Sequence, residues 1–151
     1  MDFPIIKARC TRRCQSMYPI PYEQDKYYGS WYMFVAPDMN QIRRHAGLPA
    51  ANVSIIDFIN FVKREIQRNG PVTAAFLFHE DVQHYHKGIY SHVAGERFMG
   101  HLFKVIGWGR DKGYDYWLIS NTWGRDWGEY GFGRLSINLD LAAVAYGMPR
   151  I

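Results

Sequence analysis

Two residues near the C-terminal end, His101 and Asn121, are of the types that could act together in catalysis. A histidine can take up and release a proton near neutral pH, and its two ring nitrogens have separate roles. An asparagine side-chain oxygen can accept a hydrogen bond from one ring nitrogen and hold the ring in one orientation and tautomer. The other nitrogen is then left for a reactive group. Trp123 could cover this hydrogen bond and keep water away from it.

Two apolar runs, 102–108 and 114–120, are expected to bring the pair together. Both runs have the length and composition of β-strands, and the loop between them contains Asp-Lys-Gly, a turn signal. A turn centred on Asp111 and Lys112 places the histidine nearly opposite the asparagine, on one face and with Cβ atoms roughly 5 Å apart. The alternative is a structural hairpin with a polar pair at its mouth.

A helix is predicted over about 54–69, ahead of these strands. Ser54 can cap it, with Asp57 three residues on, and Asn69-Gly70-Pro71 ends it. Its apolar face has helical spacing and consists of Ile55, Ile59, Val62 and Ile66. Strands are expected at 72–79, 102–108, 114–120 and 132–137. One main helix followed by antiparallel strands predicts an α+β fold with a barrel-like sheet.

Short motifs surround the candidate pair in a specific order. Met99-Gly100-His101-Leu102 is followed by an apolar strand and Gly107-Trp108-Gly109, and Asn121-Thr122-Trp123-Gly124 follows the next strand. These motifs resemble Gly-Gly-His-Ala, Gly-Trp-Gly and Asn-Ser-Trp-Gly of the papain-like cysteine peptidases. Segments 22–29, 69–72, 80–90 and 127–132 resemble the cathepsin B branch of that family.

The resemblance implies the second, C-terminal lobe of a two-lobed protease. Residues 1–35 would be a linker segment, 36–52 a loop insertion and 53–151 the lobe itself. His101 would be the general acid/base and Asn121 its orienting partner, with Trp123 and Gly100 in support.

The family's nucleophile is not found in this sequence. The resemblance places it in the first lobe, where a glutamine precedes Cys-Gly-Ser-Cys-Trp, and the two cysteines present, Cys10 and Cys14, lack that context. A histidine without a thiol has nothing to activate, so we expect the chain alone to be inactive. In cathepsin B relatives, cysteines at this spacing each bond to the first lobe. Here Cys10 and Cys14 are either unpaired, bonded to another chain or bonded to each other under strain.

Two functions therefore stay open. One is the C-terminal half of a cysteine peptidase, with a peptide or protein substrate and a complementary first lobe as partners. The other is a non-enzymatic binding module that retains the fold. In the resemblance, the acidic residue that lets cathepsin B accept basic side chains falls on Ala143, so an intact enzyme is expected to prefer apolar residues at that subsite.

Length and composition agree with a single folded domain. The chain has 151 residues, of which 48% are hydrophobic and 17% aromatic, which argues against disorder. The start of the chain does not resemble a signal peptide, and no apolar run approaches a membrane span. Because the family is lysosomal or secreted, we expect either that the natural N-terminus lies upstream or that the product is truncated. Asn52 begins a glycosylation sequon.

Other candidate sites are weaker. Four histidines lie close in sequence and are expected to be solvated loop residues rather than metal ligands: His79, His84, His86 and His92. We expect no metal and no cofactor. The net charge is +4, but the spacing of the basic residues follows no nucleic-acid recognition motif, so nucleic acid is not an expected partner.

Overall fold

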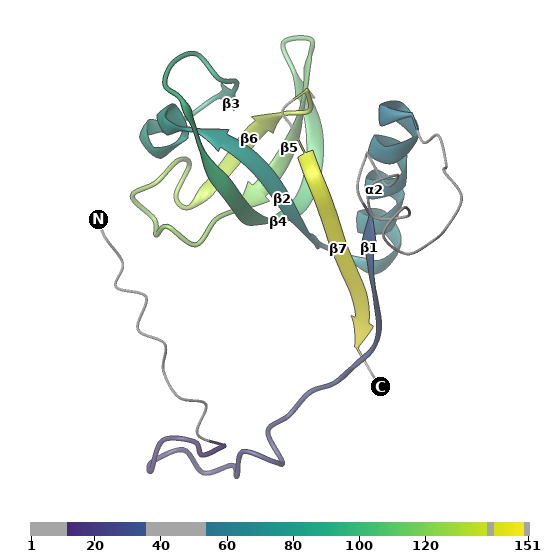
Figure 1. Ribbon diagram of the computed structural model, residues 1–151, viewed down its shortest axis with the longest axis vertical. Helices are drawn as coiled ribbons and strands as arrows, with labels where there is room; N and C mark the ends of the chain where they lie inside the picture. The colour runs from purple at the N-terminus through teal and green to yellow at the C-terminus, as the bar shows by residue number, and fades with distance from the viewer. Residues whose placement is uncertain (1–11, 36–53, 139–140, 150–151) are drawn as a thin grey trace.

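The computed structural model describes residues 12–35, 54–138 and 141–149 of the chain (Figure 1). The predicted insertion at 36–52, the sequon at Asn52 and Cys10 lie outside these residues. Among the described helices, none is long and apolar enough to cross a membrane.

The described residues form one main helix and one curved sheet. Its seven described strands lie in the order β1-β7-β2-β4-β5-β6-β3, so the sheet is open, with β1 and β3 at its edges (Figure 1). Neighbouring strands are antiparallel except β3 and β6, which are parallel. The predicted α+β class is confirmed, although the sheet is not closed and is mixed. The elements are β1 (Gly29–Val35), α2 (Ile55–Asn69), β2 (Val72–His79), the 3-10 turn η1 (Glu80–His84), β3 (Ile89–Tyr90), β4 (Arg97–Asp111), β5 (Tyr114–Ser120), β6 (Phe132–Ser136) and β7 (Leu141–Pro149).

Helix α2 begins and ends where its capping residues predict. The Ser54 hydroxyl accepts a hydrogen bond from the Asp57 backbone N–H at 3.1 Å, and Gly70, with φ 98°, ends the helix before Pro71.

The buried face of α2 differs from the predicted one. The buried residues are Phe58, Val62, Glu65 and Ile66. Ile55 is 55% exposed because it lies in the first turn, and Phe58 takes the buried position in its place. Glu65 is tolerated there because its carboxylate accepts a hydrogen bond from Asn69 Nδ2 at 2.7 Å.

The core lies on one face of the curved sheet, against α2. Alternate residues of β2 are buried, as expected for a strand with one face inward, and Phe76 and Phe78 are the largest of them. Phe103 of β4 packs its ring edge-on against Phe78, with centroids 5.0 Å apart. Trp117 of β5 is fully buried in the same cluster. This rigid aromatic core supports the end of β4 that carries His101.

The β4–β5 turn is centred one place later than predicted. Asp111 pairs with Tyr114, so the two turn residues are Lys112 and Gly113, with φ 48° and 87°. Positive φ at both positions is the geometry of a type I′ hairpin turn, and glycine adopts it without strain. A bulge between Val105 and Gly107 shifts the register again before the strand ends.

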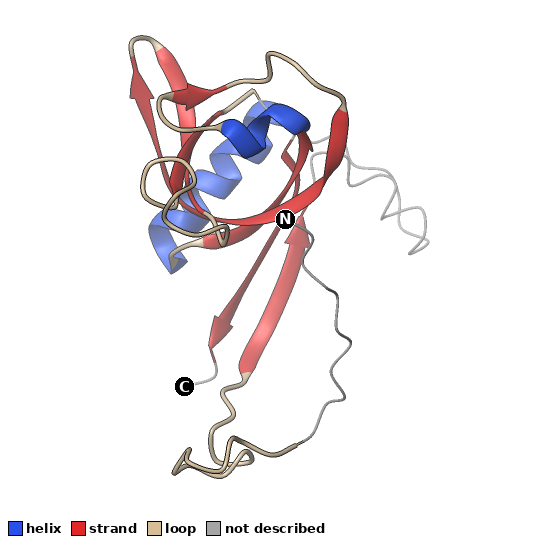
Figure 2. Ribbon diagram, turned by 90° about the vertical axis from the view of Figure 1, so that its left-hand side faces the viewer, coloured by secondary structure: helices blue, strands red, loops and turns tan. Residues whose placement is uncertain are grey.

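The segment before the lobe divides into two parts. Its last seven residues, β1, pair with β7 and so belong to the sheet. Residues 12–28 form turns and lie apart from the body of the sheet in both views (Figures 1 and 2).

Candidate functional site

His101 is held in place by the pairing of its strand with a neighbouring strand and by aromatic rings that contact its imidazole. It lies in β4 and pairs with Phe76 of β2, so its backbone is fixed in the middle of the sheet. The imidazole is half-buried. Its ring meets Phe103 nearly edge-on, with centroids 4.6 Å apart, and lies against Trp123 at 4.8 Å. These two rings leave the imidazole little freedom to rotate.

Asn121 lies within hydrogen-bonding distance of His101, as predicted. The distance from His101 Nε2 to Asn121 Oδ1 is 3.2 Å. The predicted register is nevertheless wrong: β4 and β5 pair last at Lys104 and Ser120, so the two residues meet diagonally beyond the end of β5. The contact survives the shift because long side chains reach diagonal neighbours across strands.

The hydrogen bonds around the Asn121 carboxamide determine the tautomer of the imidazole. The same Oδ1 accepts the backbone N–H of Thr122 at 2.7 Å, and an N–H can only donate, which identifies this atom as the oxygen. His101 Nε2 must therefore donate its hydrogen to Oδ1. In the neutral ring Nδ1 then has no hydrogen and is available as a base.

The Asn121 side chain lowers the stability of the fold, because one of its buried polar atoms has no hydrogen-bond partner among the described residues. Its Nδ2 is buried and makes no hydrogen bond with any residue that the structure describes. A buried donor without a partner costs about 1–3 kcal/mol. Such a cost at the residue that orients a histidine is typical of a functional position rather than one kept for stability.

The loop after β5 positions the carboxamide. The Asn121 backbone N–H donates to Gly131 O at 2.9 Å, and the Gly131 N–H donates to Trp127 O at 2.8 Å. Trp127 in turn donates its indole N–H to Val82 O at 2.9 Å, in a buried hydrogen bond. These bonds tie the loop to the turn that follows β2.

The two predicted supporting residues have different surroundings. Trp123 contacts the imidazole and also meets Trp127 edge-on, with centroids 5.6 Å apart, so it covers one side of the pair. Gly100 is exposed, and a Cβ there would make only an ordinary contact with Leu77, at 3.9 Å. Packing within the described residues does not require glycine at this position.

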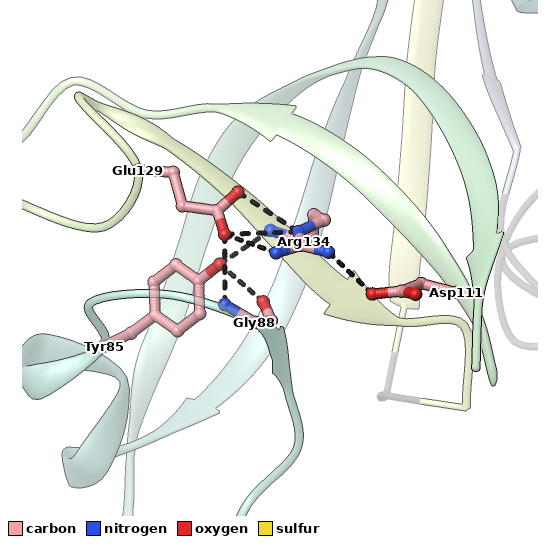
Figure 3. Close-up of polar contacts among 5 residues, drawn as sticks. All are labelled: Tyr85, Gly88, Asp111, Glu129 and Arg134. Carbon is pink, nitrogen blue, oxygen red and sulfur yellow. Dashed lines mark hydrogen bonds and ion pairs between the residues drawn. The ribbon is translucent and has the colours of Figure 1, made fainter.

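A network of charged side chains, which local sequence patterns did not reveal, braces the loop of residues 121–131 (Figure 3). Arg134 of β6 donates to both carboxylate oxygens of Glu129 and to Asp111 at the tip of the β4–β5 hairpin. Glu129 also accepts the Gly88 N–H, and Tyr85 donates to Gly88 O and accepts from the Arg134 backbone N–H. The hydrogen bonds from Arg134 lower the pKa of Glu129, against the opposing effect of burial. Glu129 lies in the 127–132 segment that resembles the cathepsin B branch, whereas nothing local in the sequence marks Arg134 as its partner.

A second network holds the loop that leads into β4. Asp81 accepts hydrogen bonds from the Tyr90 hydroxyl and from the backbone N–H groups of Val93 and Ala94, at 2.6, 2.8 and 3.2 Å. Burial would raise the pKa of Asp81, but these hydrogen bonds and the one from His92 outweigh burial and lower the pKa.

Two of the four histidines that were predicted to be solvated loop residues make a specific ring contact in the fold. His79 ends β2 rather than lying in a loop, and its ring stacks on that of His92 with centroids 3.5 Å apart. His84 and His86 are exposed, as expected for solvated residues. Within the described part of the chain, no three potential ligands converge as a metal site would require.

Two further candidate residues can be placed only partly. Cys14 is a half-buried thiol in the segment that lies apart from the sheet, and it has no disulfide partner among the described residues. The backbone of Ala143 in β7 pairs with Ala75 of β2, while its side chain is not among those described.

Comparisons with known proteins agree on one kind of protein. A family model described as papain family cysteine protease matches residues 16–147. Cathepsin B-like cysteine proteinase 3 of Ostertagia ostertagi is 38% identical over 127 residues, covering 84% of this chain and 62% of that protein. The gut-specific cysteine proteinase of Caenorhabditis elegans is 39% identical over 126 residues, covering 83% of this chain and 32% of that protein.

A solved structure supports the same relationship. Procathepsin B S9 from Trypanosoma congolense superposes with a TM-score of 0.69 at 29% identity, covering 95% of this chain and 42% of that one. The chain thus spans less than two thirds of the length of each of these proteins.

Proposed function

The chain belongs to the papain family of cysteine proteases and to its cathepsin B-like branch, and on that basis we propose that it supplies the histidine and asparagine of a peptidase active site. The supporting observation is the hydrogen bond from His101 Nε2 to an Asn121 oxygen that also accepts the Thr122 N–H. This arrangement leaves Nδ1 of the imidazole to face a nucleophile.

The proposed reaction hydrolyses a peptide bond in two steps. A thiolate attacks the scissile carbonyl, and the imidazolium gives its Nδ1 proton to the leaving amine as the C–N bond breaks, which leaves a thioester. Nδ1 then takes a proton from water as the water oxygen attacks the thioester. The C–S bond breaks, the acid product leaves and the thiolate–imidazolium pair is restored. Asn121 holds the ring in one orientation through both steps.

We propose that the thiolate comes from a complementary first lobe rather than from Cys14. Cys14 is part of the segment that lies apart from the sheet carrying His101 (Figure 2). The partners are therefore a first lobe and a peptide or protein substrate. By analogy with lysosomal and secreted members of the family, we also propose a lysosomal or extracellular location.

The test joins the chain to the nucleophile it lacks. We would refold it with the first lobe of the Caenorhabditis elegans relative and measure peptide cleavage and labelling by a thiol-reactive peptide epoxide. The assembly is expected to cleave and to label, while this chain alone does neither. His101→Ala in the assembly is expected to lower turnover by about 10²-fold or more, since general acid–base catalysis contributes roughly that much.

The matched control is His84→Ala, which removes an exposed histidine and is expected to leave turnover unchanged. Equal turnover in the two variants would refute the catalytic role of His101.

The cysteine content of the sequence favours a second candidate function, that of a non-catalytic binding module. The sequence has two cysteines, and neither has the family's nucleophile motif. A non-catalytic module would use the same fold to bind peptides or proteins. Its signature in the assembly experiment is peptide binding without cleavage or labelling.

A further inference from the structure

Tyr85 holds both ends of the tight turn at 129–132. Two backbone hydrogen bonds, of 2.8 and 3.2 Å, close this turn. Ahead of the turn, the Gly128 N–H donates to the Tyr85 carbonyl oxygen at 3.0 Å. After it, the Arg134 N–H donates to the Tyr85 hydroxyl oxygen at 3.1 Å. One residue therefore contacts the chain on both sides of the turn.

The ring of Tyr85 packs against the backbone on the same two sides. Tyr85 is buried, and its ring centroid lies 5.2 Å from that of Trp127. A Cβ on Gly128 would lie 3.0 Å from Tyr85 Cε1, and a Cβ on Gly133 would lie 3.2 Å from the same atom. Because the ring is enclosed in this way, its hydroxyl group is held in one place.

The hydroxyl group of Tyr85 connects the turn to the segment that precedes β3 (Figure 3). It donates to Gly88 O at 2.7 Å while it accepts from the Arg134 N–H. Burial raises the pKa of Tyr85, so the hydroxyl keeps the proton that it donates. Glu129 makes a second link, because its carboxylate accepts the Gly88 N–H at 3.0 Å. Gly88 is thus bonded through both of its backbone groups.

The same turn holds the backbone of Asn121. Gly131, one of its two central residues, accepts the Asn121 N–H at 2.9 Å. Strand pairing does not fix Asn121, because β5 ends at Ser120. The Asn121 carboxamide contacts His101 and the adjacent Thr122, and its buried Nδ2 has no partner among the described residues. The direction of Oδ1 therefore depends on where the turn places the Asn121 backbone.

We propose that Tyr85 and Glu129 are positioning residues, which act through the turn at 129–132 to fix the direction of Asn121 Oδ1 and with it the tautomer of His101. The proposal rests on the proposed function, because a fixed tautomer matters only if the imidazole takes up and releases protons. A displacement of Asn121 by about 1 Å would lengthen its contact with His101 beyond hydrogen-bonding distance.

The test measures the tautomer of His101 in the chain itself. Nitrogen-15 NMR, with the histidines neutral, gives the ratio of the Nε2–H form to the Nδ1–H form. Tyr85→Phe keeps the ring and removes the hydroxyl, and Glu129→Gln keeps the shape of the side chain and removes its charge. Each variant is expected to lower the ratio by about fivefold, which corresponds to one hydrogen bond. In the two-lobe assembly, each is expected to lower kcat by about tenfold with little change in KM.

The matched control is Tyr90→Phe, which removes another buried tyrosine hydroxyl, one that donates to Asp81 at 2.6 Å instead of contacting the turn. It is expected to leave the ratio and kcat unchanged, so a loss of stability alone cannot produce the expected result. An unchanged ratio in Tyr85→Phe or in Glu129→Gln, or an equal fall in Tyr90→Phe, would overturn the proposal. If the unmodified assembly does not cleave peptides, the proposed function fails, whereas the NMR ratios still decide the positioning role.

Discussion

His101 is surrounded by two aromatic rings and one carboxamide, and the carboxamide alone determines which ring nitrogen is free. The rings of Phe103 and Trp123 restrict rotation but cannot distinguish Nδ1 from Nε2. The Asn121 oxygen can, because it accepts from Nε2. The orientation of the base therefore depends on one side chain whose own Nδ2 lacks a partner among the described residues.

Removal of that oxygen is expected to affect turnover more than substrate binding. In the two-lobe assembly, Asn121→Ala should lower kcat by about 10- to 100-fold with little change in KM, since it misorients a catalytic group without touching substrate. Steady-state kinetics measures both. Asn138→Ala, at an exposed asparagine, serves as the control. A rise in KM at constant kcat would contradict an orienting role.

Tyr130 is a strained residue in the loop that holds Asn121. Its φ is 57°, which is a left-handed backbone conformation that costs free energy for a residue with a Cβ. Its side chain is 82% exposed, so packing offsets little of this cost. Tyr130→Gly is expected to raise stability by about 0.5–1 kcal/mol in denaturant unfolding. Tyr114→Gly, at a similarly exposed tyrosine with strand geometry, should instead destabilise the chain. The same sign of change for both variants would contradict the strain argument.

At the scale of elements, the Arg134 network connects β6, the 121–131 loop and the turn after η1 (Figure 3). Glu129→Gln replaces a carboxylate that accepts from Arg134 and Gly88, and we expect it to cost about 1–3 kcal/mol of unfolding free energy. Asp115→Asn is the matched control because its partner Arg110 is 3.8 Å away on an exposed surface, where ion pairs contribute below about 1 kcal/mol. A loss in Glu129→Gln no larger than in the control would show that the network does not brace the loop.

The loop before β4 should loosen in acid. The pKa of Asp81 is lower in the folded state, so the unfolded chain binds its proton first as the pH falls. The stability from Asp81 is therefore fully present above its unfolded value, about 4, and is lost as the pH falls further toward its folded value. Hydrogen exchange at Val93 and Ala94 should report this loss, after correction for the intrinsic rate.

Asp81→Asn provides the comparison for this pH effect. It should remove most of the protection of Val93 and Ala94 at neutral pH and flatten its pH dependence. Unchanged protection in the variant would contradict the role of the carboxylate.

For the molecule as a whole, local signals in the sequence were sufficient where one short segment determines the structure. The cap at Ser54, the stop at Gly70 and the strand runs predicted α2, β2, β5 and β6 to within one residue at each end. The predicted hairpin brought His101 next to Asn121, and the order of the motifs predicted the family.

Interactions between distant segments were not predictable in this way. The shifted turn at Lys112 and Gly113 and the bulge after Val105 depend on how the hairpin packs, so the register was misassigned although the contact was right. The same holds for the partnership of Arg134 with Glu129, the stacking of His79 on His92 and the parallel pairing of β3 with β6. Each requires the fold before it can be recognised.

The claim on which the proposed chemistry depends is that Asn121 holds His101 with Nε2 protonated and Nδ1 free. Nitrogen-15 NMR of the chain at about pH 8.5, where an imidazole is neutral, reports the tautomer directly. We expect His101 to be almost entirely the Nε2–H form and to become a mixture of tautomers in Asn121→Ala. An Nδ1–H tautomer in the unmodified chain, or the same spectrum in both proteins, would contradict the account.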